Sequence, residues 1–146
     1  MSTIYFDLDG TLADLYAVKE WLEKIRSGDP TPFREARPMV QMNQLSRLVN
    51  LLQGEGYKVG IISWLPMGCS PEFAEEVRKE KKRWLARRAT SIAWDEIHLV
   101  KYGTPKHSCC RDINGVIFDD NEKVRETWRG KAFNEKQILD ILKQLL

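Results

Sequence analysis

The sequence predicts an α/β fold, with a mainly parallel sheet flanked by helices in the three-layer, Rossmann-like arrangement, in one domain over residues 1–146. Two observations predict it. Short apolar runs typical of buried strands alternate along the chain with segments whose apolar residues recur at helical spacing. Gly, Pro and Asn residues separate these segments. Strands that alternate with helices form βαβ units, and these units make a parallel sheet covered on both faces.

The predicted strands are short and apolar. Four of them are expected to be buried, and a fifth is a short edge strand; they cover residues 3–6, 57–62, 97–100, 115–118 and 131–133.

The predicted helices are marked by capping residues and by proline. Asp14 is expected to cap a helix that runs to Ile25, and residues 27–37 are expected to form a loop. Pro38 suits the first turn of a second helix, which Gly54 and Gly56 end. Four later helices are expected. One begins at Ser70-Pro71 and runs to about Arg88, and a short one begins at Thr104-Pro105. The next passes through Val124 and Trp128, and the last starts at Asn134, with Gln137 at a capping-box position.

Composition excludes several classes of protein. Of 146 residues, 42% are hydrophobic and 30% are charged, which is ordinary for a soluble globular protein. No apolar run approaches the roughly 20 residues that span a bilayer, and we expect no secretory signal from the first residues given. Three cysteines cannot all pair within one chain, so we expect free thiols and a cytoplasmic location. A net charge of +2 is too small to indicate a nucleic-acid partner.

One basic run, residues 78–88, has two interpretations. Its lysines and arginines surround Trp84, a pattern compatible with nucleic-acid binding. The interpretation we favour is a solvated helix face, with Phe73, Val77 and Trp84 as the buried stripe.

The candidate functional residues all follow predicted strands. Reactive groups collect at the carboxyl ends of the strands in such sheets. Four positions satisfy this rule: Asp7-Leu8-Asp9-Gly10-Thr11, Ser63, Lys106, and Asp119-Asp120.

This set suits phosphoryl transfer. An ionised Asp7 can attack phosphorus and form an aspartyl-phosphate. Asp9 can protonate the leaving oxygen and later deprotonate the attacking water. Gly10 allows close backbone approach to a ligand, and Ser63 and Lys106 can bind phosphate oxygens.

A magnesium site is expected at the same edge. Hard oxygen ligands suit Mg²⁺, and they would come from Asp7, from Asp9 through its backbone carbonyl, and from Asp119 or Asp120. Which of the last two binds the ion directly depends on where the preceding strand ends.

The motifs resemble those of the haloacid-dehalogenase superfamily. Asp7-Leu8-Asp9-Gly10-Thr11 is similar to its first motif, and Ser63, Lys106 and Phe118-Asp119-Asp120 match the next three in order. The resemblance implies that Asp7 is the nucleophile, that Asp9 is the general acid and base, and that a fourth-motif acid completes the Mg²⁺ site. Lys101 could replace Lys106 as the third-motif lysine; we favour Lys106, because a helix N-terminus adds positive potential.

Relatives in this superfamily often carry a cap domain, and this chain has no room for one. We therefore expect an open site, partly covered by residues 14–37, with Gly10, Thr11 and Trp64 among its substrate-binding residues.

The expected substrate is a phosphomonoester, either a nucleotide or a related metabolite. The chain also resembles small phage and bacterial proteins of the nucleotidase-like kind, a likeness that does not fix the substrate. Two alternatives remain. One is a phosphatase for polynucleotide ends, suggested by Arg125 and Trp128-Arg129. The other is an idle module that binds nucleotide or protein. The oligomeric state is left open, and no membrane partner is expected.

Overall fold

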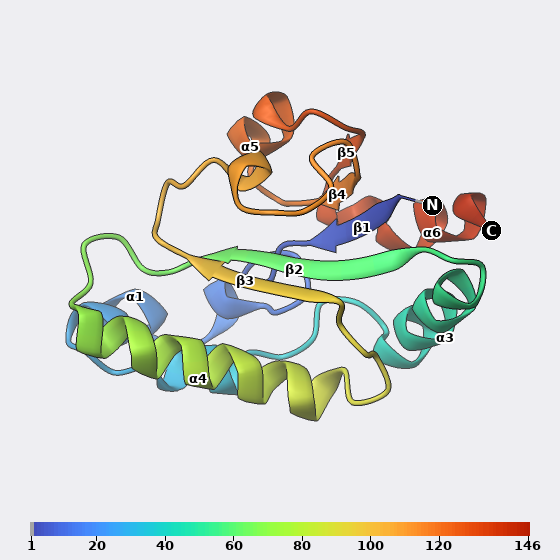
Figure 1. Ribbon diagram of the computed structural model, residues 1–146. Coiled ribbons are helices and arrows are strands. Elements are labelled where there is room, and N and C mark those ends of the chain that lie inside the picture. The colour runs from blue at the N-terminus through green and yellow to red at the C-terminus, as the bar shows by residue number, and fades with distance from the viewer. Residues whose placement is uncertain (1) are drawn as a thin grey trace.

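A five-stranded parallel sheet forms the centre of the molecule. The computed structural model describes residues 2–146. The strands are β1 (Thr3–Phe6), β2 (Lys58–Trp64), β3 (Glu96–Val100), β4 (Val116–Phe118) and β5 (Ala132–Phe133), in the spatial order β3-β2-β1-β4-β5 (Figure 1). Neighbouring strands are parallel throughout, as expected for βαβ units.

The first strand of the chain is the central strand of the sheet. Ile4 pairs with Val59 of β2 on one side and with Val116 of β4 on the other. β1, β2 and β4 therefore end at the same edge, and the residues that follow β1 and β4 are neighbours.

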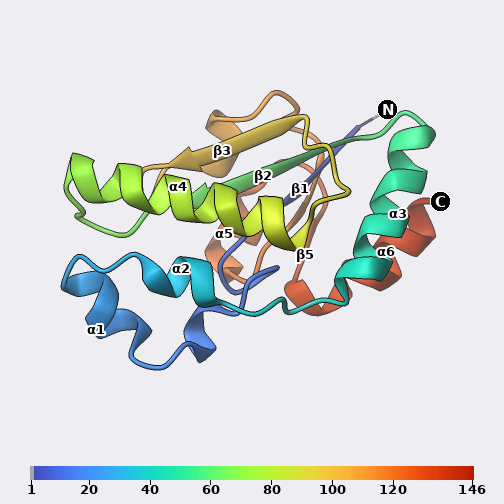
Figure 2. The same cartoon turned by 90° about the horizontal axis from the view of Figure 1, so that it is seen from below.

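Helices cover both faces of the sheet unequally. Alternate residues of each strand point to opposite faces. Ile4 and Phe6 belong to the larger core, under α3 (Met42–Gly54), α4 (Pro71–Arg88) and α6 (Ile138–Leu145). Tyr5 belongs to the smaller core, under α5 (Glu122–Thr127). Figure 2 shows α4, α2 and α1 on the near side of the sheet, with α3 beside α6 at one end. The predicted three-layer α/β fold without a separate cap domain is confirmed.

The segment after β1 differs from the single helix expected over residues 14–25. It forms a 3-10 turn, η1 (Leu15–Ala17), and then α1 (Trp21–Arg26), separated by Glu20 in the left-handed region at φ +60°. The break allows the rings of Tyr16 and Trp21 to pack edge to face with centroids 4.9 Å apart. Tertiary packing overrides the helical spacing here.

Residues 27–37, expected to be a loop, contain α2 (Thr31–Glu35), and Phe33 of this helix is buried. Pro38 does not begin the next helix, because it bridges Ala13 in an antiparallel pair. α3 starts at Met42 instead, where the side chain of Gln41 accepts a hydrogen bond from the Gln44 N–H at 2.7 Å.

The later elements lie close to the expected ones. Ser70 caps α4, which ends at Arg88. The helix expected after Thr104-Pro105 is only a 3-10 turn, η2 (Lys106–Ser108). Asn134 and Gln137 form the expected capping box over η3 (Glu135–Gln137), ahead of α6.

Two other expectations can be compared with the structure. The three cysteines are free. No helix within residues 2–146 combines the length and apolar character needed to cross a membrane.

Candidate active site

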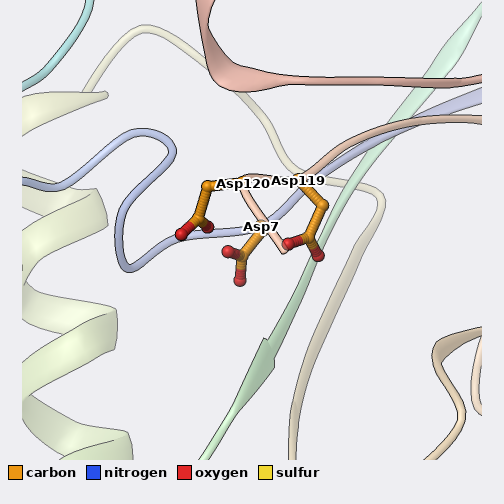
Figure 3. A group of neighbouring side chains, drawn as sticks. All are labelled: Asp7, Asp119 and Asp120. Atoms are coloured by element: carbon orange, nitrogen blue, oxygen red, sulfur yellow. The ribbon is translucent and has the colours of Figure 1, made fainter. Parts of the chain in front are cut away.

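Three carboxylates meet at the carboxyl edge of the sheet. Asp7 follows β1, and Asp119 and Asp120 follow β4. The ladder continues one residue past each strand: the Asp7 N–H donates to the Phe118 carbonyl at 2.9 Å, and the Asp119 N–H donates to the Phe133 carbonyl at 3.0 Å. One carboxylate oxygen from each of the three lies within 4.8 Å of the others (Figure 3). We call Asp7, Asp119 and Asp120 the acid trio.

The electrostatics of the acid trio favour a bound cation. Burial and the charge of Asp7 raise the pKa of Asp119 to about 7 and that of Asp120 to about 8. Burial acts in the same direction on Asp7, but the ammonium of Lys106 and the hydrogen bond with Asp120, with a smaller effect of Lys81, together outweigh it and lower the pKa of that carboxyl. Clustered carboxylate oxygens are the ligands that Mg²⁺ prefers, so the donor set fits this ion.

Lys106 is the lysine that lies at the acid trio. Its Nζ donates to Asp7 Oδ1 at 3.0 Å, to Asp119 Oδ2 at 2.6 Å and to the Ile62 carbonyl at 3.0 Å. Burial opposes its charge, but the two carboxylates raise the pKa of Lys106, which therefore stays protonated. Lys101, the alternative from sequence, is exposed.

Thr11 and Gly10 shape the other side of the trio. The hydroxyl oxygen of Thr11 lies 3.2 Å from Asp7 Oδ2 and 3.1 Å from Asp120 Oδ1. Gly10 has φ +80°, and a Cβ at this position would lie 2.5 Å from Asp120 Oδ2. Only glycine combines this conformation with this approach.

Asp9 is not part of the acid trio. Its Oδ2 forms an ion pair of 2.9 Å with Lys81 Nζ. Burial and the charge of Asp7 raise the pKa of Asp9 against the opposing effect of Lys81. The carboxylate of Asp9 is therefore paired with Lys81 and is not one of the three clustered carboxylates.

Lys81 is the residue that sequence reasoning missed. It is fully buried on α4, inside the basic run that was interpreted as a solvated face, and Glu80 is also buried. The signal was present, because Lys81 is four residues after Val77 and three before Trp84 and so shares the face of the buried stripe. The expectation of a solvated face is wrong at these two positions. The stripe of Phe73, Val77 and Trp84 is buried as expected.

A cleft of about 470 Å³ opens above the acids. Ser63 and Lys106 lie at its base with Asp7. Its walls are largely apolar and come from η1, α1, α2 and the segments after β2 and β3; they include Leu15, Tyr16, Trp21, Leu22, Ile25, Phe33, Trp64, Leu65, Pro66, Met67 and Tyr102. The segment at 14–37 thus covers the site in part, as expected.

Aromatic rings flank the acids on two sides. The Trp64 indole lies 5.5 Å from Lys106 Nζ and 5.0 Å from the Tyr102 ring, centroid to centroid, and its Nε1–H donates to the Thr104 carbonyl at 2.8 Å. On the other side, a Cβ on Gly10 would lie 2.7 Å from a Tyr16 ring carbon. Tyr16, Met67 and Tyr102 are 52%, 72% and 45% exposed, so the cleft has an apolar rim open to solvent.

Comparison with solved structures identifies the fold. The chain is similar to D,D-heptose 1,7-bisphosphate phosphatase from Burkholderia thailandensis, with a TM-score of 0.60 and 9% identity over 99% of this chain and 97% of that one. It is also similar to the D,D-heptose 1,7-bisphosphate phosphatase from B. bronchiseptica, complexed with magnesium and phosphate, with a TM-score of 0.54 and 12% identity over 99% and 98%. No protein-family model and no curated protein sequence matches the chain. The likeness establishes the fold. Because the match covers 97% and 98% of the two phosphatase chains, neither of them has a large domain without a counterpart here.

Proposed function

We propose that this protein is a Mg²⁺-dependent phosphatase of the haloacid-dehalogenase type that hydrolyses phosphomonoesters through an aspartyl-phosphate. The observation that supports this most is the meeting of Asp7, Asp119 and Asp120 around one position, with Lys106 bound to two of them. The fold shared with two phosphatases, one of them complexed with magnesium and phosphate, supports the same reaction class.

The acid trio would hold the cation, with the backbone carbonyl of Asp9 as a further ligand. When bound, Mg²⁺ would reduce the repulsion between the anionic nucleophile and the anionic phosphate. Lys106 adds a fixed positive charge at the same place, and the hydroxyl of Ser63 can donate to a phosphate oxygen. Gly10 and Thr11, predicted from sequence to bind substrate, are both buried and are not among the residues that line the cleft; they would act by holding the carboxylates of Asp7 and Asp120.

In the first step a carboxylate oxygen of Asp7 bonds to phosphorus while the bond from phosphorus to the leaving oxygen breaks. Asp9 donates a proton to that leaving oxygen. In the second step water attacks phosphorus, Asp9 takes its proton, and the Asp7–phosphorus bond breaks. The products are an alcohol and inorganic phosphate, and both carboxyl groups return to their starting states.

Within this class we propose a nucleotide or a related small aromatic phosphate as substrate. The walls beyond the acids are aromatic and aliphatic, and Trp64 and Tyr102 offer ring faces on which a base can stack. Among residues 2–146, the cationic side chains that line the cleft are Arg26 and Lys106. Such walls suit a planar ring better than a polyhydroxylated sugar, which needs many hydrogen-bonding partners.

Hydrolysis of p-nitrophenyl phosphate tests the reaction class. We expect turnover that requires Mg²⁺, is abolished by EDTA, and is lost in Asp7→Asn. Asp140→Asn, at an exposed acid on α6, is the matched control and should keep full activity. A folded protein that binds Mg²⁺ but hydrolyses no phosphate ester would favour the binding module instead.

A substrate panel tests the substrate class. Nucleoside monophosphates are expected to give higher kcat/KM than sugar phosphates. Higher activity on phosphorylated oligonucleotides, falling steeply with salt, would instead favour the polynucleotide phosphatase.

A further inference from the structure

Lys81 contacts two residues of the candidate site that are far apart in the sequence: Asp9, which follows β1, and Ser63, near the end of β2. Its Nζ donates to Asp9 Oδ2 at 2.9 Å, to Ser63 Oγ at 2.7 Å and to the Trp64 carbonyl at 2.7 Å. The side chain is fully buried, and Nζ also lies 5.2 Å from the centroid of the Phe33 ring.

These contacts use the full donor capacity of the lysine. An ammonium group carries three N–H donors and no acceptor, so each N–H of Lys81 has one partner. The position of Nζ is therefore fixed by one acceptor after β1, on Asp9, and by two acceptors at the end of β2, on Ser63 and Trp64.

The contact with Ser63 sets the direction of its hydroxyl. Because Ser63 Oγ accepts a hydrogen bond from Lys81, its own O–H must donate elsewhere. Ser63 is buried and lines the cleft beside Asp7. Its proton is therefore available to a phosphate oxygen.

A purely structural role explains this arrangement less well. Burying an ammonium group is costly, and an apolar side chain of similar volume is often as stabilising as a buried ion pair. Lys81 occupies a position on the apolar stripe of α4 where methionine would fit the pattern, yet its three partners all belong to the candidate site or adjoin it.

We propose that Lys81 is a positioning residue: it fixes the carboxylate of Asp9 where the leaving oxygen departs and the hydroxyl of Ser63 where the phosphate binds. This inference rests on the proposed phosphatase function. Lys81 does not contact the substrate; it holds the proton donor and the phosphate ligand at a constant separation.

The test compares Lys81→Met with Lys82→Met, an exposed lysine on the same helix, on substrates with different leaving groups. The parameter is kcat/KM, because it reports only the steps up to departure of the leaving group. An alkyl or nucleoside phosphate needs proton donation, and positioned proton transfer contributes about 10²–10⁴-fold. We therefore expect Lys81→Met to lose roughly 100-fold in kcat/KM on such substrates.

On p-nitrophenyl phosphate the leaving group departs without protonation. The loss expected there is about tenfold or less, from weaker phosphate binding through Ser63. Inhibition by inorganic phosphate should weaken by a similar factor, while Lys82→Met should match the unchanged protein on every substrate.

A double variant separates positioning from general damage. If Lys81 acts through Asp9, then Asp9→Asn with Lys81→Met should lose on alkyl phosphates, beyond the loss of Asp9→Asn alone, only the factor of about tenfold or less that arises through Ser63. Should Lys81→Met fail to fold, Lys81→Arg keeps the charge but replaces the single nitrogen with a planar fork, and it is expected to show the same dependence on leaving group.

Equal losses on alkyl and aryl phosphates, or no loss relative to Lys82→Met, would overturn the positioning role. Absence of hydrolysis by the unchanged protein would overturn the phosphatase function itself. The two failures are therefore distinguishable.

Discussion

Thr11 and Asp120 are 109 positions apart in the sequence, and they meet through two hydrogen-bonding contacts at the edge of the acid trio. The hydroxyl oxygen of Thr11 lies 3.1 Å from Asp120 Oδ1, and it accepts the Asp120 backbone N–H at 3.2 Å. The same oxygen lies 3.2 Å from Asp7 Oδ2. One hydroxyl therefore links the residues that follow β1 and β4.

Replacing Thr11 by valine keeps its shape and removes that link. Partners that orient metal ligands contribute about 10–100-fold to metal affinity, so Thr11→Val should weaken Mg²⁺ binding by this factor in calorimetric titration. Thr127→Val is the control, because that hydroxyl bonds only to carbonyls of its own helix. Equal Mg²⁺ affinity in both variants would show that Thr11 does not orient the trio.

Replacing Lys106 by methionine leaves Asp7 and Asp119 without their shared cation. Removing one partner of a buried ion pair costs about 3–5 kcal/mol, and we expect this loss in the free energy of unfolding measured in urea at pH 8. Mg²⁺ should recover part of it. The matched variant Lys101→Met, at an exposed lysine, should unfold like the unchanged protein. A Lys106→Met protein of full stability would contradict the pairing.

The stability of the metal-free protein should fall as the pH rises from 5.5 to 8. The pKa values of Asp119 and Asp120, about 7 and about 8, lie above the value near 3.9 of an unfolded Asp. The folded chain therefore binds more protons than the unfolded chain in this interval, and the free energy of unfolding decreases with pH until both groups are ionised.

Mg²⁺ replaces those protons, so it should raise the thermal midpoint more at pH 8 than at pH 5.5. Asp120→Asn should flatten the upper part of the metal-free profile. A midpoint that rises with pH without metal would mean that these carboxyl groups are ionised in the folded protein throughout.

The rim of the cleft should contribute to substrate affinity. Stacking of a base on an aromatic side chain contributes about 1–3 kcal/mol, so Tyr102→Ala should raise KM for a nucleoside monophosphate roughly tenfold. Inhibition by inorganic phosphate should not change, because the groups proposed to bind phosphate are Lys106 and Ser63 and not Tyr102. Met67→Ala, the second rim variant, should also raise this KM. Its control is Met39→Ala, at an exposed methionine outside the cleft, and the control should leave KM unchanged. Unchanged KM in both rim variants would remove the support for an aromatic substrate.

Gly60 of β2 should be intolerant of a side chain. A Cβ there would lie 2.9 Å from carbons of the Tyr5 ring. That ring cannot move freely, since its hydroxyl donates to Glu96 Oε2 at 2.8 Å and accepts the Asp112 N–H at 3.0 Å. Gly60→Ala should cost about 1–3 kcal/mol in urea unfolding. Gly54→Ala, where a Cβ meets nothing within 4 Å, should cost nothing.

The sheet and the acids could be predicted because their signals are local. Apolar runs such as residues 3–6 and 115–118 have the length and composition of buried strands, and the acids follow them directly. Once the strands are parallel and β1 is central, Asp7 and Asp119 must meet at one edge. The site geometry therefore follows from the order of the elements.

The parts that could not be predicted depend on contacts between distant segments. The break at Glu20 becomes favourable only when Tyr16 packs on Trp21. Lys81 carries a charge inside a charged run, and its burial depends on its distant partners Asp9, Ser63 and the Trp64 carbonyl. Local propensity contains no information on either arrangement.

The central position of β1 has a consequence for biosynthesis. The ribosome makes this strand first, yet one of its two neighbours, β4, is made only after residue 115. The nascent chain can pair β1 with β2 while one side of β1 is still uncovered. Asp119 and Asp120 are made after Lys106 and join Asp7 only then, so the positive charge is available before the negative charges are brought together.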